Sequence, residues 1–282
     1  MAEEARKAPA VPHAGVGGDG RVDGASGRAG ATGRAPAAGT AGMRQPVRLK
    51  KPSTWQQYKT LLGKDLTQEF RTKEMLTSMG IYALLVLVVY GATLAQSGGQ
   101  VDILQMSGGL LWTLIVFTSL LGLNRSFSHE KEQGCLEGIL LVPLDRSVVF
   151  LAKATSNLLF LLAVEVIAIP LFCFFFMTSV PLAESALLAL APLVVGTVGV
   201  AGIGTLLSTI TVNTRGKDVM LAVLFIPLVF PLLYACVSAT TVVVVGAEGY
   251  LDAFVPAMAL AAGYDVVMLL ASWVLYDFVV SA

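Results

Sequence analysis

The chain has 282 residues, of which 55% are hydrophobic and only 13% are charged, and its 19 basic residues balance its 19 acidic residues. Ordinary globular domains contain roughly 25% charged residues. This composition therefore excludes a disordered protein and a soluble nucleic-acid-binding protein, so no nucleic acid is expected as a partner. It also argues against a soluble enzyme and indicates an integral membrane protein.

Residues 1–50 differ in kind from the rest of the chain. They are rich in Gly, Ala, Pro and Arg and show no hydrophobic periodicity. Such a composition predicts a disordered cytoplasmic tail. Met43 is an alternative start of translation, and the sequence leaves both starts open.

Residues 51–76 have the pattern of an amphipathic helix. One stripe of the helix, wound at 100° per residue, contains Trp55, Tyr58, Leu62, Leu66 and Phe70. Because Trp and Tyr favour the headgroup layer, we expect an interfacial helix that lies on the inner membrane surface. A plain cytoplasmic helix is the alternative.

Six apolar stretches in residues 77–282 are long enough to cross roughly 30 Å of hydrocarbon as helices. Their hydrophobicity is continuous rather than alternating, which argues against a β-barrel. The sequence therefore predicts an all-α integral membrane protein with six transmembrane helices, arranged as a permease domain. The predicted spans are about Thr77–Ala95, Ser107–Leu123, Ala154–Met177, Ala186–Ile210, Asp218–Thr240 and Val255–Val280.

The basic residues are confined to alternate segments of the chain. Thirteen lie in residues 1–76, and the others lie in or beside the segments that follow the second and fourth spans. Positive charge stays on the cytoplasmic side of a membrane. We therefore expect both termini to face the cytoplasm.

The motifs of common catalytic and cofactor sites are missing from the sequence. No glycine-rich phosphate loop followed by Lys and Ser or Thr occurs, so we expect no ATP site of that type. The three cysteines form no C-x-x-C pair, and His13 and His129 are the two histidines. We expect no catalytic residues, no metal site and no directly bound cofactor.

Residues 124–150, which follow the second span, form a short charged segment punctuated by glycine and proline. A helix of about Ser128–Leu136 is expected within it. Because its ends join two different spans, such a helix could act as a lever across the cytoplasmic end of the bundle. An ordinary solvated connector is the alternative.

The residues in and around this segment resemble the haem exporter protein B family. The resemblance extends over about Trp55–Asp277 and leaves residues 1–50 outside. It rests on Gly122-Leu-Asn124-Arg125-Ser126-Phe127, Glu130, Gly134, Leu136-Glu137-Gly138, Pro143, Asp145-Arg146-Ser147, Phe150 and Lys153.

This resemblance implies a non-catalytic permease subunit of the ABC transporter complex for cytochrome c maturation, in the bacterial inner membrane. The implied partners are a cytoplasmic ABC ATPase subunit that holds ATP, a haem-handling membrane protein, an outer-side haem chaperone and a second copy of the chain in a homodimer. Haem is the implied cargo. The lack of an outward histidine favours release of a haem-loaded chaperone over passage of haem through the chain.

In such families the segment after the second span carries the coupling helix that contacts the ATPase. Carried over by position, the residues implied in this contact are Asn124, Arg125, Glu130, Gly134, Leu136, Glu137, Gly138, Pro143, Asp145 and Arg146.

Two acids and three glycines within the spans are further candidates. Glu165 lies near the middle of the third span, where a carboxylate costs several kcal/mol unless it is paired or protonated. It either lines a polar internal surface or subunit interface, or is a protonated acid bonded to a neighbouring hydroxyl. Asp265 in the sixth span is a second intramembrane acid. Gly196, Gly199 and Gly202 are expected to serve close helix packing.

Two other functions remain open from the residues alone. An exporter permease for a lipid, drug or polysaccharide would share the looser loop pattern, although the Leu-Asn-Arg-Ser-Phe and Asp-Arg-Ser sequences argue against it. A non-transporting membrane scaffold would tolerate disruption of residues 124–150.

Overall fold

The computed structural model describes the backbone of residues 53–96, 98, 101–132, 145–177, 182–211, 214, 216–246 and 248–281. The chain divides into two units, Met1–Arg48 and Leu49–Ala282. Every helix named below belongs to the second unit. The tail predicted for residues 1–50 lies outside the described residues.

Helix α1 (Thr54–Thr72) occupies the segment expected on the membrane surface. It ends at Lys73, which has the left-handed conformation with φ of 54°, and whose backbone N–H donates to the Glu69 carbonyl. The Glu69 side chain accepts a second hydrogen bond, from the Leu76 N–H at 2.9 Å. Because the first N–H groups of a helix have no partner within it, Glu69 fixes how the next helix follows α1.

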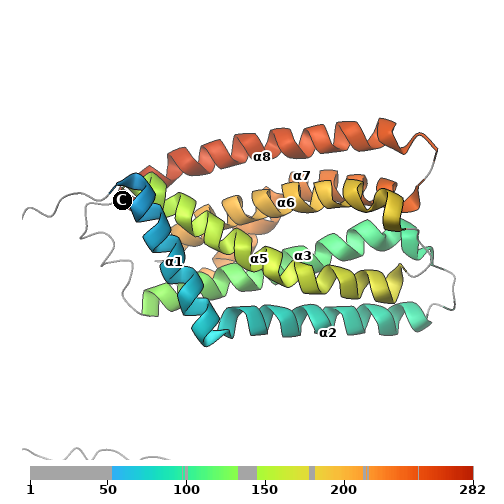
Figure 1. Ribbon diagram of the computed structural model, residues 1–282, viewed down its shortest axis with the longest axis horizontal. Helices are drawn as coiled ribbons and strands as arrows, with labels where there is room; N and C mark the ends of the chain where they lie inside the picture. The colour runs from blue at the N-terminus through green and yellow to red at the C-terminus, as the bar shows by residue number, and fades with distance from the viewer. Residues whose placement is uncertain are drawn as a thin grey trace, which may run out of the picture. The chain divides into compact units, whose positions relative to one another are not determined.

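Six further helices carry the hydrophobic stretches, and each is long and apolar enough to cross a membrane. They run alongside one another, and α1 crosses one end of them obliquely (Figure 1). The predicted all-α architecture with six membrane-spanning helices is confirmed for the described residues. The helices are α2 (Glu74–Gln96), α3 (Ile103–Glu132), α5 (Arg146–Phe176), α6 (Leu182–Thr211), α7 (Lys217–Val245) and α8 (Tyr250–Ser281).

Helices α3 and α5 extend beyond the spans predicted from hydrophobicity. With 30 and 31 residues, each is about 45 Å long at 1.5 Å per residue. The helix expected at about Ser128–Leu136 is confirmed as helical in its described part, but it is not separate, because α3 continues without a break through Glu132. The physical reason is that no glycine or proline occurs between Gly122 and Gly134. Loss of hydrophobicity marks the membrane boundary and does not by itself end a helix.

Helix α6 lies at the centre of the packed helices. In its most apolar, membrane-spanning part 72% of the residues are buried, whereas only 17% are buried in that of α8. It packs against α5, α7, α8 and α3. Apolar side chains on α2 and α8 face outward instead, as expected of helices whose solvent is lipid. The polar contacts of α6 are therefore the contacts most deeply enclosed by the protein.

Candidate functional site

The structure places both ends of the 124–150 segment on helices. Asn124 and Arg125 lie in α3, and the backbone of Glu130 belongs to the last turn of the same helix. Asp145 immediately precedes α5, and Arg146 is its first residue. The other residues implied in the ATPase contact, Gly134, Leu136, Glu137, Gly138 and Pro143, lie outside the described residues.

An ion pair joins α3, about two turns before its end, to the start of α2. The Arg125 guanidinium contacts the carboxylate of Glu74, the first residue of α2. Both side chains are more than half exposed, at 51% and 59%, and exposed pairs contribute only about 0–1 kcal/mol. The pair therefore orients Arg125 at the end of the bundle without adding much stability.

A side chain of α1 binds the backbone at the start of α5. Gln57 is the buried residue of α1, only 3% exposed. Its Oε1 accepts a hydrogen bond from the backbone N–H of Asp145 at 3.1 Å. A side-chain acceptor from another helix thus meets an N–H group at the beginning of α5, where intrahelical partners are lacking. This contact fixes the backbone of residue 145 where α5 begins.

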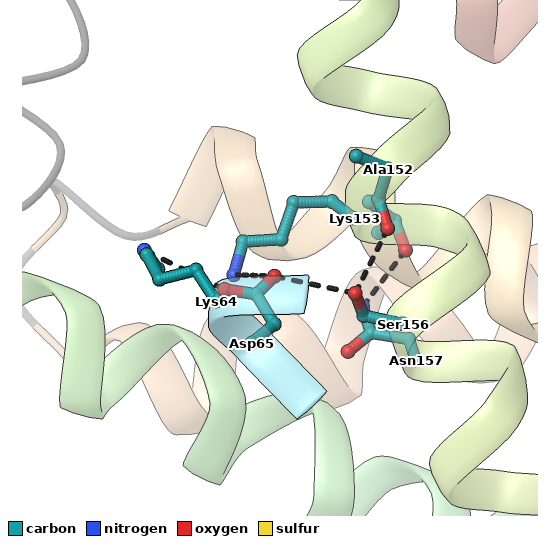
Figure 2. Close-up of polar contacts among 7 residues, drawn as sticks. Lys64, Asp65, Ala152, Lys153, Ser156 and Asn157 are labelled. Carbon is teal, nitrogen blue, oxygen red and sulfur yellow. Dashed lines mark hydrogen bonds and ion pairs between the residues drawn. The ribbon is translucent and has the colours of Figure 1, made fainter. Parts of the chain in front are cut away.

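A second contact between α1 and α5 lies two turns further along both helices. Figure 2 shows the Asp65 carboxylate reaching from α1 to Lys153 and Ser156 on α5. Asp65 Oδ2 lies 3.2 Å from Lys153 Nζ and also accepts a hydrogen bond of 3.2 Å from Ser156 Oγ. Lys64 Nζ lies 3.5 Å from the other carboxylate oxygen. The carboxylate is therefore shared among three donors.

Burial makes this cluster sensitive to the loss of either partner. The Lys153 and Asp65 side chains are only 10% and 11% exposed. Taking two charges out of water costs several kcal/mol, and their mutual attraction and added hydrogen bonds offset that cost. If one partner is removed, the other remains as an uncompensated charge. The cluster consequently fixes the position of α1 on α5.

The polar contacts continue from α5 to α6. Asn157, the residue after Ser156, donates from Nδ2 to Thr205 Oγ1 at 2.9 Å. Thr205 in turn donates to the Ala201 carbonyl at 2.6 Å. Both Asn157 and Thr205 are buried. A buried polar route thus runs from α1 through α5 to the central helix.

A second contact between α5 and α6 places Glu165. Thr197 Oγ1 donates to Glu165 Oε1 at 2.8 Å, and the Glu165 side chain is buried. Glu165 follows Asn157 by eight residues, and Thr197 precedes Thr205 by eight residues. The two contacts therefore share one antiparallel register and are about 12 Å apart along the helices. The candidate Glu165 thus points to a hydroxyl of the same chain.

The second intramembrane acid packs against another side of α6. Asp265 of α8 is 5% exposed, and its Oδ1 has no hydrogen-bond partner among the described residues. A Cβ added at Gly199 would collide with that oxygen. Because residues two apart on a helix point about 200° apart, Glu165 at Thr197 and Asp265 at Gly199 contact nearly opposite sides of α6.

The other two candidate glycines also lie at close helix contacts. A Cβ at Gly196 would overlap the Trp112 ring, and a Cβ at Gly202 would overlap Leu269. Trp112 is held in place by donation from Nε1 to Thr240 Oγ1 at 3.0 Å. Gly196 therefore admits an α3 side chain, whereas Gly199 and Gly202 admit side chains of α8.

Sequence reasoning missed Gln57, Asp65 and Thr197 as site residues. Lys153 belonged to the family motif, but nothing local to it identifies Asp65, which is 88 residues away. One available signal was the spacing of Gln57 and Asp65, which puts both on one helical face. Within the part of the chain that the structure describes, no three His, Cys, Asp or Glu side chains gather as a metal ion would require.

The part of the chain that forms these helices also matches a known protein family. The sequence model of the CcmB protein family matches residues 56–280, a range that includes nearly the whole of α1 and α8. The chain belongs to the CcmB family. Heme exporter protein B of Pseudomonas aeruginosa is 27% identical over 177 residues, which cover 62% of this chain and 77% of that protein. The resemblance to the haem exporter protein B family is thereby confirmed.

Membership of the CcmB family fits the architecture described above. Together with the six apolar helices, it identifies the chain as a multi-pass protein of the inner membrane. CcmB proteins are membrane subunits of a transporter and not catalytic enzymes. The buried polar contacts described above join α1 to α5 and α5 to α6 within this subunit.

Proposed function

We propose that this chain is the membrane subunit of a haem-export complex that includes other subunits. ATP hydrolysis by a cytoplasmic ATPase subunit is coupled through it to haem export, or to release of a haem-loaded chaperone at the outer face. Membership of the CcmB family and the similarity to a protein named Heme exporter protein B support the assignment to haem export.

The observation that carries the coupling proposal is the way α5 is held where it begins. The segment in which the ATPase contact is implied enters α5 at Asp145 and Arg146, and within twelve residues of Asp145 this helix contacts α1 and α6 through buried polar groups. A displacement of that segment is transmitted to α1 through Gln57 and Asp65, and to α6 through Asn157. Because α5 is one continuous helix of 31 residues, the same displacement reaches Glu165.

The chemistry of the chain favours chaperone release over passage of haem. Its two histidines are His13, in the predicted cytoplasmic tail, and His129, in the last turns of α3. Neither lies at the predicted outer side, where an exported haem would need an axial ligand. In this proposal a haem-handling membrane protein and an outer-side haem chaperone are the partners that hold haem. ATP is held by the partner subunit, and two copies of this chain form the membrane unit.

A charge-reversal experiment on the native complex tests the coupling. Glu130→Lys combined with Glu137→Lys should abolish copurification of the ATPase subunit, or its stimulation, and lower the yield of c-type cytochromes. Glu248→Lys, at an exposed acid in a predicted outer loop, is the matched control and should change neither. Equal membrane insertion of both variants excludes loss of the chain from the membrane as the cause of any difference.

The outcomes separate the alternatives. If ATPase binding and cytochrome yield both survive the double reversal, the chain is a scaffold or the contact lies elsewhere, and the coupling proposal is wrong. Absorption spectra and identification of partners in the purified complex test the cargo. Haem bound to this chain alone would favour passage of haem, and a copurified lipid, drug or polysaccharide system would overturn the haem assignment.

A further inference from the structure

A small cavity within the membrane lies between α3 and α5. Its lining has two polar side chains, Thr118 of α3 and Glu165 of α5. The remaining lining is apolar and consists of Leu114, Ile115, Leu161, Val164, Ala168 and Ile169. The cavity is only just large enough for one water-sized molecule.

Thr118 is the polar group that this cavity leaves unexplained. Its side chain is 4% exposed, and its Oγ1 has no hydrogen-bond partner among the described residues. On the same two helices, the buried hydroxyls of Ser119 and Ser156 do have partners. A buried hydroxyl without a partner loses its hydration and gains nothing in return, which is rare in native proteins.

Glu165 is the second polar group that a molecule in the cavity would contact. Its Oε1 accepts from Thr197, but a carboxyl group has two oxygens and can accept several hydrogen bonds. A molecule in the cavity would therefore meet a hydroxyl on one side and a carboxyl group on the other. One hydroxyl and one carboxyl are too few for a cation such as Ca²⁺, which takes roughly six to eight oxygen ligands. They are sufficient for a water molecule, because buried waters in proteins typically have about two to four polar partners.

We propose that this cavity is a water-binding site in which one buried water bridges the Thr118 hydroxyl to the Glu165 carboxyl. The bridge joins three helices at one point, because Glu165 is already bonded to Thr197 of α6. Helices α3 and α5 are also the two helices that flank residues 133–144. A water bridge can be broken and remade by exchange of one molecule, so it holds these helices together while allowing them to separate. The inference rests on the cavity and its lining and does not depend on the proposed function.

Hydroxyl-radical footprinting by radiolysis tests the site in the full-length chain in lipid nanodiscs. Radicals formed from a bound water oxidise the side chains that surround it. Ile115, which lines the cavity, is expected to be labelled several-fold more than Ile203, which is also buried in the core but does not line the cavity. Labelling of Ile115 no greater than that of Ile203 would overturn the proposal, and this comparison requires no mutation.

Variants of Thr118 supply an independent measurement. Thr118→Val has nearly the same shape but no hydroxyl, and it should lower the labelling of Ile115 several-fold and leave Ile203 unchanged. Thr118→Ser keeps the hydroxyl and should retain the labelling. The melting temperature gives the second readout, since removal of a water-bridged hydroxyl lowers it by about 2 °C. An unchanged label, or a higher melting temperature for Thr118→Val, would show that the hydroxyl is unpartnered and the cavity dry.

Discussion

Asp65 of α1 and Lys153 of α5 form an ion pair of 3.2 Å in which both side chains are nearly enclosed, at 11% and 10% exposure. The pair connects residues 88 apart in the sequence. It joins the helix that precedes the first span to the third turn of the helix that follows residues 133–144. This contact, together with that of Gln57, makes α1 part of the support of α5.

Removal of the Asp65 charge should strongly destabilise the chain. Asp65→Asn leaves the Lys153 ammonium enclosed without a counter-charge, and we expect a loss of about 3 kcal/mol in the free energy of unfolding. Denaturant unfolding of the purified chain in detergent measures this loss. Exchange of the two charges, Asp65→Lys with Lys153→Asp, should recover part of it.

Lys64 provides the matched control for that prediction. Its ammonium also contacts Asp65, but at 3.5 Å and with 38% of the side chain exposed. Lys64→Gln should therefore cost less than about 1 kcal/mol. Equal losses for Asp65→Asn and Lys64→Gln would show that burial of the Lys153 pair is unimportant.

The hydrogen bond between Thr197 and Glu165 should be measurable as a coupling. Thr197→Val and Glu165→Leu each remove one partner of the 2.8 Å contact. A double-mutant cycle should give a coupling of about 0.6 kcal/mol and at most about 1.7 kcal/mol, the average and the maximum for hydrogen bonds between membrane helices. Strictly additive effects would contradict the contact. A stable Glu165→Leu variant with normal c-type cytochrome yield would show that the acid serves packing alone.

Substitution of Gly199 should be harmful, whereas the same substitution at Gly263 should not. A Cβ at Gly199 collides with the Asp265 carboxylate and with Leu232, whereas a Cβ at Gly263 has no atom within 4 Å. We expect Gly199→Ala to lose about 1–3 kcal/mol and Gly263→Ala to gain about 0.5–1 kcal/mol. Thermal unfolding of the two variants tests the opposite signs. Asp265→Ala should partly relieve Gly199→Ala, and no relief would place the clash elsewhere.

Arg125 should matter for the partner more than for stability. Its pair with Glu74 is exposed, so Arg125→Gln should cost at most about 1 kcal/mol. If the end of α3 contacts the ATPase subunit, the same variant should reduce copurification of that subunit. A large fall in melting temperature with unchanged copurification would reverse this assignment of roles.

The spans and the family motif could be predicted because each depends on residues that are close together in the sequence. The start of α5 and the end of α3 were less accurately predicted, since their terminal turns are polar and lie beyond the apolar stretches. Lys153 illustrates the limit. Its charge suggested a residue at the membrane boundary, yet the structure encloses it against Asp65.

The sequence by itself determined the membrane class, the six spans and the family, because hydrocarbon imposes length and apolarity on each span separately. Only the tertiary structure decided which polar groups meet. The contacts of Asp65 with Lys153 and of Glu165 with Thr197 depend on the rotation and register of whole helices. A rotation of one residue would turn each of these side chains by about 100° and separate the partners. The balance of 19 basic and 19 acidic residues likewise says nothing of the buried pair on which α1 and α5 depend.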